Sequence, residues 1–197
     1  MQSIEQDWLN KALKGDQDAF TVIIERFETP VYNLCYRMLG CSQDAEDASQ
    51  ETFIRAYQSL GSYDTGRSFG TWLLAIAAHY CIDQIRRRRY PTVAIEELPV
   101  PDLPDKNLDV ESKLIVKEER VRIRRLIHQL EPIDRAAVIL YYWNDLSYEE
   151  ISHTLGLTIS AVKSRLHRAR RAMATEWIKT QPDEMLRERR WNESPTV

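Results

Sequence analysis

The sequence lacks the features that mark a disulfide-stabilised or membrane-spanning protein. Its three cysteines are too few for a disulfide framework in a chain of 197 residues, and we predict ordinary, partly buried thiols. The longest apolar run, residues 136–143, falls far short of the ~18 residues that span a membrane. No basic region followed by an apolar core indicates a signal peptide. We therefore expect a cytoplasmic protein without direct membrane insertion.

The chain also lacks the usual parts of an enzyme. It has four histidines, no glycine-rich phosphate loop and no compact Cys/His cluster, and His79 with Cys81 would supply only half of a zinc site. We predict no catalytic residue, no metal and no cofactor.

What the sequence does contain is a helical pattern of apolar residues. These make up 43% of the chain and charged residues 29%, a balance typical of a globular protein whose length allows one domain or two small ones. The apolar residues recur at helical spacing almost throughout, and no strictly alternating run indicates a sheet. The sequence predicts an all-α fold.

Three helical segments are expected before residue 90. The first covers about residues 4–40, with a break at Gly15 and Asp16 as the N-cap of the part that follows. The second covers about residues 43–60. The third begins after a cap at Ser68 and runs into four consecutive arginines, residues 86–89.

The second of these segments has two distinct faces. Its core face is predicted to consist of Ala45, Ala48, Phe53, Ala56, Tyr57 and Leu60. Another face carries residues at i, i+3, i+4 and i+7, namely Asp47, Gln50, Glu51 and Ile54. Because the core does not use it, this second face is available for a partner.

The helical pattern stops between residues 90 and 109, where four of the eight prolines lie among acidic residues. This composition predicts two small helical domains joined by a Pro-rich acidic linker. We place the first domain at residues 1–90, the linker at 91–111, the second domain at 112–178 and a tail of unknown role at 179–197.

The second domain has the pattern of a helix-turn-helix. Helices are expected at about residues 112–130 and 133–143, the latter with Pro132 at its first position. Ser147 and Glu150 match a capping box, Gly156 ends the short helix that follows, and Ser160 is a second cap candidate. The final helix buries an apolar stripe and exposes cations, as a DNA-recognition helix does.

Positive charge is concentrated in two places, although the net charge is −3. Residues 67–89 sum to +4 and residues 157–175 to +5. Both clusters could neutralise DNA phosphates, whereas a solvated helix end explains the four arginines at 86–89 equally well.

Three motifs in order carry a family resemblance. The chain has DAEDASQETFIRAY from Asp44, then FGTWLLAIAAHYCIDQIRRRR and, after the linker, LSYEEISHTLGLTISAVKSRLHRARRAM. Over about residues 10–175 it resembles the extracytoplasmic-function (ECF) sigma factors, small two-domain members of the bacterial sigma-70 family. The resemblance implies a non-catalytic RNA polymerase subunit that directs the core enzyme to specific promoters and helps to open them. The alternative is a free-standing dimeric helix-turn-helix regulator.

For the first domain, the resemblance implies two roles. The face formed by Asp47, Gln50, Glu51 and Ile54 is expected to contact the clamp helices of the largest core polymerase subunit. The loop 63–67 and the helix after it are expected to capture an unstacked base and melt the minus-ten element. The residues assigned to minus-ten DNA are Tyr63, Asp64, Arg67, Trp72, His79, Arg86, Arg87 and Arg88. The spacing of Trp72 with Phe69 and Ile76 suits a place in the core equally well.

For the second domain, the resemblance implies contact with the minus-thirty-five element in the major groove. The assigned residues are Ser160, Lys163, Ser164, Arg165, His167 and Arg168. Lys163 and Arg168 are the preferred base contacts, and Arg170 and Arg171 are interpreted as a solvated helix end. The resemblance also implies an anti-sigma factor as a partner. The acidic linker either substitutes for nucleic acid in the polymerase cleft or is a simple tether.

Overall fold

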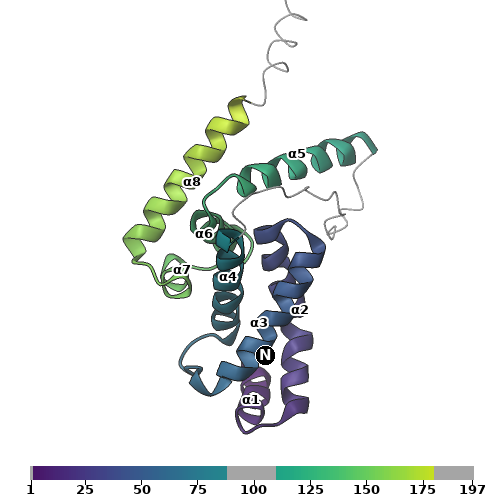
Figure 1. Cartoon of the computed structure of the whole chain (residues 1–197), viewed down its shortest axis with the longest axis vertical. Helices are drawn as coiled ribbons and strands as arrows, with labels where there is room; N and C mark the ends of the chain where they lie inside the picture. The colour runs from purple at the N-terminus through teal and green to yellow at the C-terminus, as the bar shows by residue number, and fades with distance from the viewer. Residues whose placement is uncertain (1, 88–109, 180–197) are drawn as a thin grey trace, which may run out of the picture.

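The computed structural model describes residues 2–87 and 110–179, and within them it contains helices and turns but no strand (Figure 1). The first unit consists of α1 (Gln2–Leu13), α2 (Gln17–Leu39), α3 (Ser42–Ser59), a 3-10 turn η1 (Leu60–Ser62) and α4 (Phe69–Arg87). The second consists of α5 (Val110–His128), α6 (Pro132–Tyr142), α7 (Tyr148–Leu155) and α8 (Ile159–Lys179). The all-α prediction is confirmed. Most of the predicted linker and the tail lie outside the described residues.

Local capping explains where most of these helices begin and end. Asp16 accepts a hydrogen bond from the Ala19 amide at 3.1 Å, and Ser68 accepts one from the Thr71 amide at 3.4 Å, as predicted. The C-cap of α2 is Gly40, whose φ of 81° is a left-handed conformation that glycine adopts without strain.

The core of the first unit lies where α2 meets α3 and α4. Leu34, Met38 and Leu73 are fully buried there. Cys35 and Cys81 are buried side by side, and a hydrogen bond between them, together with burial, raises the pKa of the Cys81 thiol. Cys41 is half-buried. The Cys81 thiol therefore stays protonated at neutral pH. Both buried thiols act as small apolar groups.

The two units share one continuous core, which the sequence did not predict. Helix α6 packs against both α2 and α4, and α7 packs against α4, so that the second unit lies along one side of the first (Figure 1). Ile139 and Leu140 of α6 are fully buried in this core.

The end of α2 is the polar part of this contact. Arg135 of α6 donates a hydrogen bond to the Met38 carbonyl at 2.7 Å, and Arg124 of α5 donates one to the Tyr36 hydroxyl at 3.1 Å. Because the carbonyls at a helix C-terminus have no partner within the helix, cations from another element stabilise them.

Candidate nucleic-acid interface

The outer face of α3 is polar with two exposed apolar side chains. Asp47, Gln50 and Ile54 are exposed, and Glu51 forms an ion pair with Arg55 at 2.7 Å. Ile54 is 52% exposed and Tyr57 is 46% exposed. The prediction that Tyr57 lies on the core face was wrong, because its side chain is exposed, although its ring packs against Phe20 in a T-shaped arrangement at 5.0 Å between centroids. This arrangement is typical of a surface that a partner covers.

The loop between η1 and α4 is fixed by its own hydrogen bonds. The Asp64 carboxylate accepts from the Gly66 amide at 2.9 Å and pairs with the Arg67 guanidinium at 3.2 Å. The Tyr63 hydroxyl donates to the Arg67 carbonyl, which ties the two ends of the loop together. The loop therefore presents Asp64 and Arg67 to solvent on a defined backbone.

Tyr63 and Trp72 belong to an aromatic cluster at the start of α4. Their ring centroids are 5.2 Å apart, and Phe69 lies within 5.4 Å of both. Tyr63 is 8% exposed, and burial, with a smaller effect of Asp64, raises the pKa of its hydroxyl. The Tyr63 side chain is thus buried and supports the loop from beneath, and Trp72 is half-buried. Their contact with DNA stays a prediction.

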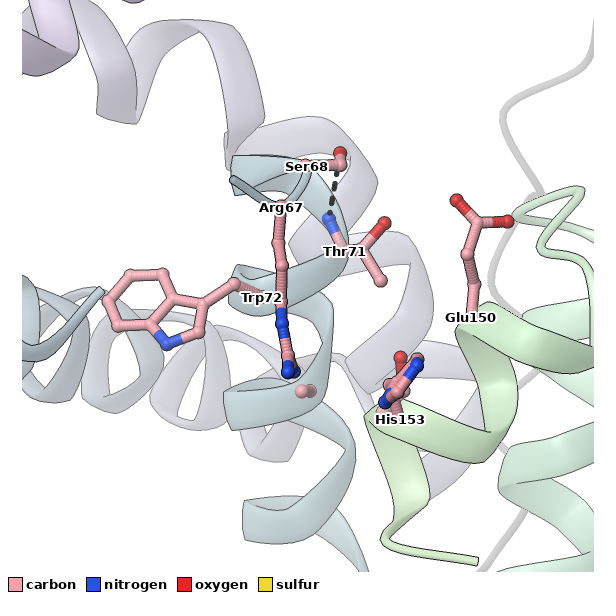
Figure 2. Close-up of a pocket in the computed structure, with 8 residues that line it drawn as sticks. Arg67, Ser68, Thr71, Trp72, Glu150 and His153 are labelled. Atoms are coloured by element: carbon pink, nitrogen blue, oxygen red, sulfur yellow. Dashed lines mark hydrogen bonds between the residues drawn. The ribbon is translucent and has the colours of Figure 1, made fainter. Parts of the chain in front are cut away.

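A cleft of about 230 Å³ lies where α4 meets α7 (Figure 2). Its first-unit wall includes Arg67, Thr71 and Trp72, and its second-unit wall includes Glu150 and His153. Figure 2 shows the Arg67 side chain running along α4, while the Trp72 indole points away from α7. Part of the expected minus-ten surface therefore faces the helix-turn-helix.

The rest of the expected minus-ten residues follow along α4. His79 is exposed, with its Nδ1 2.8 Å from the Ala75 carbonyl oxygen. Arg86 and Arg87 are exposed in the last turn of α4, where the helix dipole also stabilises positive charge. Arg88 lies outside the described residues.

The second unit contains the predicted helix-turn-helix. Ser147 and Glu150 form both hydrogen bonds of the capping box, at 2.8 and 3.1 Å, and Gly156 ends α7 with a φ of 64°. The cap prediction at Ser160 was wrong, because the Ala161 amide donates to the Thr158 hydroxyl at 3.2 Å and α8 begins at Ile159, two residues before the start that a cap at Ser160 implies. Ser160 is instead an exposed residue of the first turn.

Helix α8 separates its buried and exposed residues as predicted except at Arg165, which was expected to be exposed and is half-buried. Val162, Leu166 and Ala169 are buried. The exposed residues among those expected to meet DNA are Ser160, Lys163, Ser164, His167 and Arg168. This gives one cationic face that is not needed for packing, as major-groove recognition requires.

Three cations of α8 are held by neighbouring side chains. Arg165 is half-buried and donates to the carboxylate of Asp134 in α6 at 2.6 Å. Lys163 lies over the Tyr148 ring at 5.6 Å, and Arg170 donates to the Tyr142 hydroxyl at 2.8 Å. Arg170 and Arg171 are both exposed, as predicted for solvated residues, and Arg170 in addition contacts the aromatic surface of α6. Sequence reasoning missed Asp134, because its role depends on a contact 31 residues along the chain.

Two further features are absent from the part of the chain that the structure describes. Within residues 2–87 and 110–179, no group of three or more His, Cys, Asp or Glu side chains is placed to hold a metal ion. None of the described helices is long and apolar enough to cross a membrane.

An all-α chain with a cationic helix-turn-helix is typical of DNA-binding proteins, and the comparisons with known proteins identify its family. Residues 23–90 match Sigma-70 region 2, and residues 120–173 match Sigma-70, region 4. The chain belongs to the ECF sigma factors of the sigma-70 family. These matches lend no support to the free-standing regulator.

The relatives cover nearly the whole chain. The chain is 35% identical to the ECF RNA polymerase sigma factor SigW of Bacillus subtilis (strain 168), over 84% of this chain and 92% of that protein. It is 31% identical to the ECF RNA polymerase sigma-E factor of Escherichia coli (strain K12), over 87% and 93%.

Solved structures share the fold at lower identity. CnrH in complex with the cytosolic domain of CnrY matches with a TM-score of 0.66 at 23% identity, over 89% of this chain and 97% of that one. The sigma factor RpoE in complex with the anti-sigma factor NepR from Bartonella quintana matches with a TM-score of 0.61 at 23% identity, over 82% and 98%.

Proposed function

We propose that this sigma factor is the promoter-specificity subunit of RNA polymerase and itself performs no covalent chemistry. One observation carries the proposal: the α8 cations and the outer face of α3 both stay outside the core, on separate units of a chain that belongs to the ECF family. One surface would bind DNA and the other would bind core polymerase.

Each surface has a defined partner in this proposal. The α3 face, with Asp47, Gln50, Glu51 and Ile54, would bind the clamp helices of the largest core subunit. The 63–67 loop and α4 would bind and open the minus-ten element, and α8 would bind the minus-thirty-five element. An anti-sigma factor is the expected inhibitor, since two structures that share the fold are complexes with CnrY and with the anti-sigma factor NepR.

The proposed function requires the two units to separate. The two promoter elements are centred about 25 base pairs apart, which at 3.4 Å per base pair is roughly 85 Å. Helices α4 and α7 pack directly against each other, so one molecule in this arrangement cannot place α4 and α8 on both elements at once. In this proposal the arrangement seen here is a closed form, which opens when the protein binds core polymerase and the promoter.

The test is assembly with bacterial core RNA polymerase, followed by run-off transcription on a promoter library. We expect one-to-one association and new promoter-selective transcripts. Glu51→Arg should weaken core binding at least tenfold, whereas Glu28→Arg, the same charge change on exposed α2 surface, should not. Lys163→Ala should weaken recognition of the minus-thirty-five element and leave core binding intact.

Two results would contradict this proposal. Unchanged core affinity of Glu51→Arg would remove the α3 face from the docking surface. Sequence-selective DNA binding by the chain alone, with no association with core polymerase, would favour a free-standing regulator.

A further inference from the structure

Asp134 connects the body of the second unit to its recognition helix. It lies in the first turn of α6, and its side chain is 13% exposed. Its Oδ1 accepts a hydrogen bond from Arg165 at 2.6 Å, and its Oδ2 lies 3.9 Å from the Arg168 guanidinium. A single carboxylate thus faces two cations of α8 that are three residues apart on the same side of the helix.

The Arg165 and Arg168 side chains differ in their exposure to solvent. Arg165 is 27% exposed and lies between the buried stripe of α8 and its cationic face, whereas Arg168 is 62% exposed. The hydrogen bond to Asp134 occupies one terminal nitrogen of the Arg165 guanidinium. Because a guanidinium has five N–H groups in a rigid plane, the remaining donors keep a fixed orientation.

We propose that Asp134 is a positioning residue for promoter recognition, which orients Arg165 so that its free edge meets a base in the major groove. The inference rests on the proposed function of α8. Holding the side chain before binding removes most of the entropy that an unrestrained arginine would lose on contact with a base. Arg165 would then act as a base contact, although Lys163 and Arg168 were the preferred ones from sequence.

The carboxylate also limits binding that does not depend on sequence. DNA phosphates attract every free cation on α8, and such contacts add affinity without discriminating between bases. Asp134 neutralises part of the Arg165 and Arg168 charge and repels phosphates. Asp134 therefore favours DNA sites where a base presents a hydrogen-bond acceptor to Arg165 over DNA sites where Arg165 can reach only the phosphate backbone.

Asp134→Asn tests this role with little change in shape. The variant is assembled with core polymerase, and binding is measured on a promoter library randomised in the minus-thirty-five element. We expect about tenfold less discrimination at one or two base pairs of that element. We also expect the plot of log affinity against log salt concentration to become steeper by about one, because the released arginines can neutralise phosphate.

The control is Glu149→Gln, which removes one negative charge from the exposed first turn of α7 in the same helix-turn-helix. It should leave the base preference unchanged. Base preference is a ratio between sequences, so a variant that only reduces the folded fraction does not alter it. Arg165→Lys should lose the same preference, and the double variant Asp134→Asn/Arg165→Lys should lose no more than Arg165→Lys alone.

Three outcomes would overturn the proposal. Asp134→Asn could retain the full base preference, or Glu149→Gln could lose it to the same extent. In both cases a changed preference in Lys163→Ala would show that α8 still binds the element and that only the role of Asp134 is wrong. If Lys163→Ala, Arg165→Lys and Arg168→Ala all kept the preference, the assignment of α8 to the minus-thirty-five element would fail as well.

Discussion

The guanidinium of Arg135 in α6 donates a hydrogen bond of 2.7 Å to the carbonyl oxygen of Met38 at the end of α2. This hydrogen bond joins the two units through a buried side chain. The same guanidinium donates to the carbonyls of His128 and Leu130 at the end of α5. Burial lowers the pKa of Arg135 to about 10, so it remains charged at neutral pH. One cation therefore caps two helices that belong to different units.

Replacing Arg135 should destabilise the protein. Arg135→Met keeps most of the apolar volume but leaves three carbonyls without their donor, and we expect a loss of about 2–4 kcal/mol in the free energy of unfolding. Arg125→Met on the exposed side of α5 should change it by less than ~0.5 kcal/mol. Urea denaturation at pH 7.5 measures both, and equal costs would show that Arg135 contributes no more than a surface cation.

Gly40 and Gly156 form a matched pair for testing the contact between the units. Both are helix C-caps with positive φ, but a Cβ at Gly40 would lie 2.6 Å from the His128 ring, whereas one at Gly156 would meet nothing within 4 Å. Gly156→Ala should cost about 1–2 kcal/mol of stability through backbone strain alone. Gly40→Ala should cost at least about 1 kcal/mol more, because His128 must move.

The difference between the two glycine variants is measured by denaturation under identical conditions. Equal losses would mean that the end of α2 and His128 do not pack closely in solution. In that case the closed arrangement would not be the dominant form of the free protein.

His128 should make the stability pH-dependent. Burial, followed by the positive charges of Arg135 and Arg124, lowers its pKa to about 4 from the ordinary 6.5, against a smaller opposing hydrogen bond with the Arg37 backbone. The folded state therefore binds fewer protons than the unfolded one between these values. The contribution of neutral His128 to the free energy of unfolding is therefore complete above pH 6.5 and is lost as the pH falls from 6.5 through 4. Between pH 7 and pH 5 we expect this loss to be about 2 kcal/mol.

The His128 contribution is isolated by comparison with His128→Gln, which cannot titrate. The free energy of unfolding of the parent should fall more steeply than that of the variant between pH 7 and pH 5. Parallel profiles would show that His128 is exposed to solvent and therefore that the units are already apart.

Locking the closed form should block transcription. Ala75 of α4 and His153 of α7 line the same cleft, so Ala75→Cys/His153→Cys in a Cys41→Ser background should be joined by a short reducible bismaleimide. We expect the cross-linked sigma factor to lose promoter-directed transcription, because its units cannot span both elements, and reductant to restore it. Each single-cysteine variant, treated in the same way, is the control, and full activity of the cross-linked protein would refute the need for opening.

The candidate sites could be predicted where they depend on local sequence. The i, i+3, i+4, i+7 pattern placed Asp47, Gln50 and Ile54 on one exposed face of α3, and the α8 pattern separated Val162 and Leu166 from Lys163 and His167. Helical spacing could not place Tyr57, which lies at the edge of the core face and is exposed there. It also could not show that Tyr63 is buried, since that follows from the packing of Phe69 and Trp72.

The sequence alone determined the helices, most of their caps and the family, because helix formation and capping depend on residues within a few positions of one another. Only the tertiary structure decided that α6 and α7 pack on the first unit, that Arg135 caps α2, and that Asp134 binds Arg165. These contacts join residues 31 and 97 positions apart, and no local pattern specifies them. They depend on which buried surfaces and unpaired carbonyls the folded units present to each other.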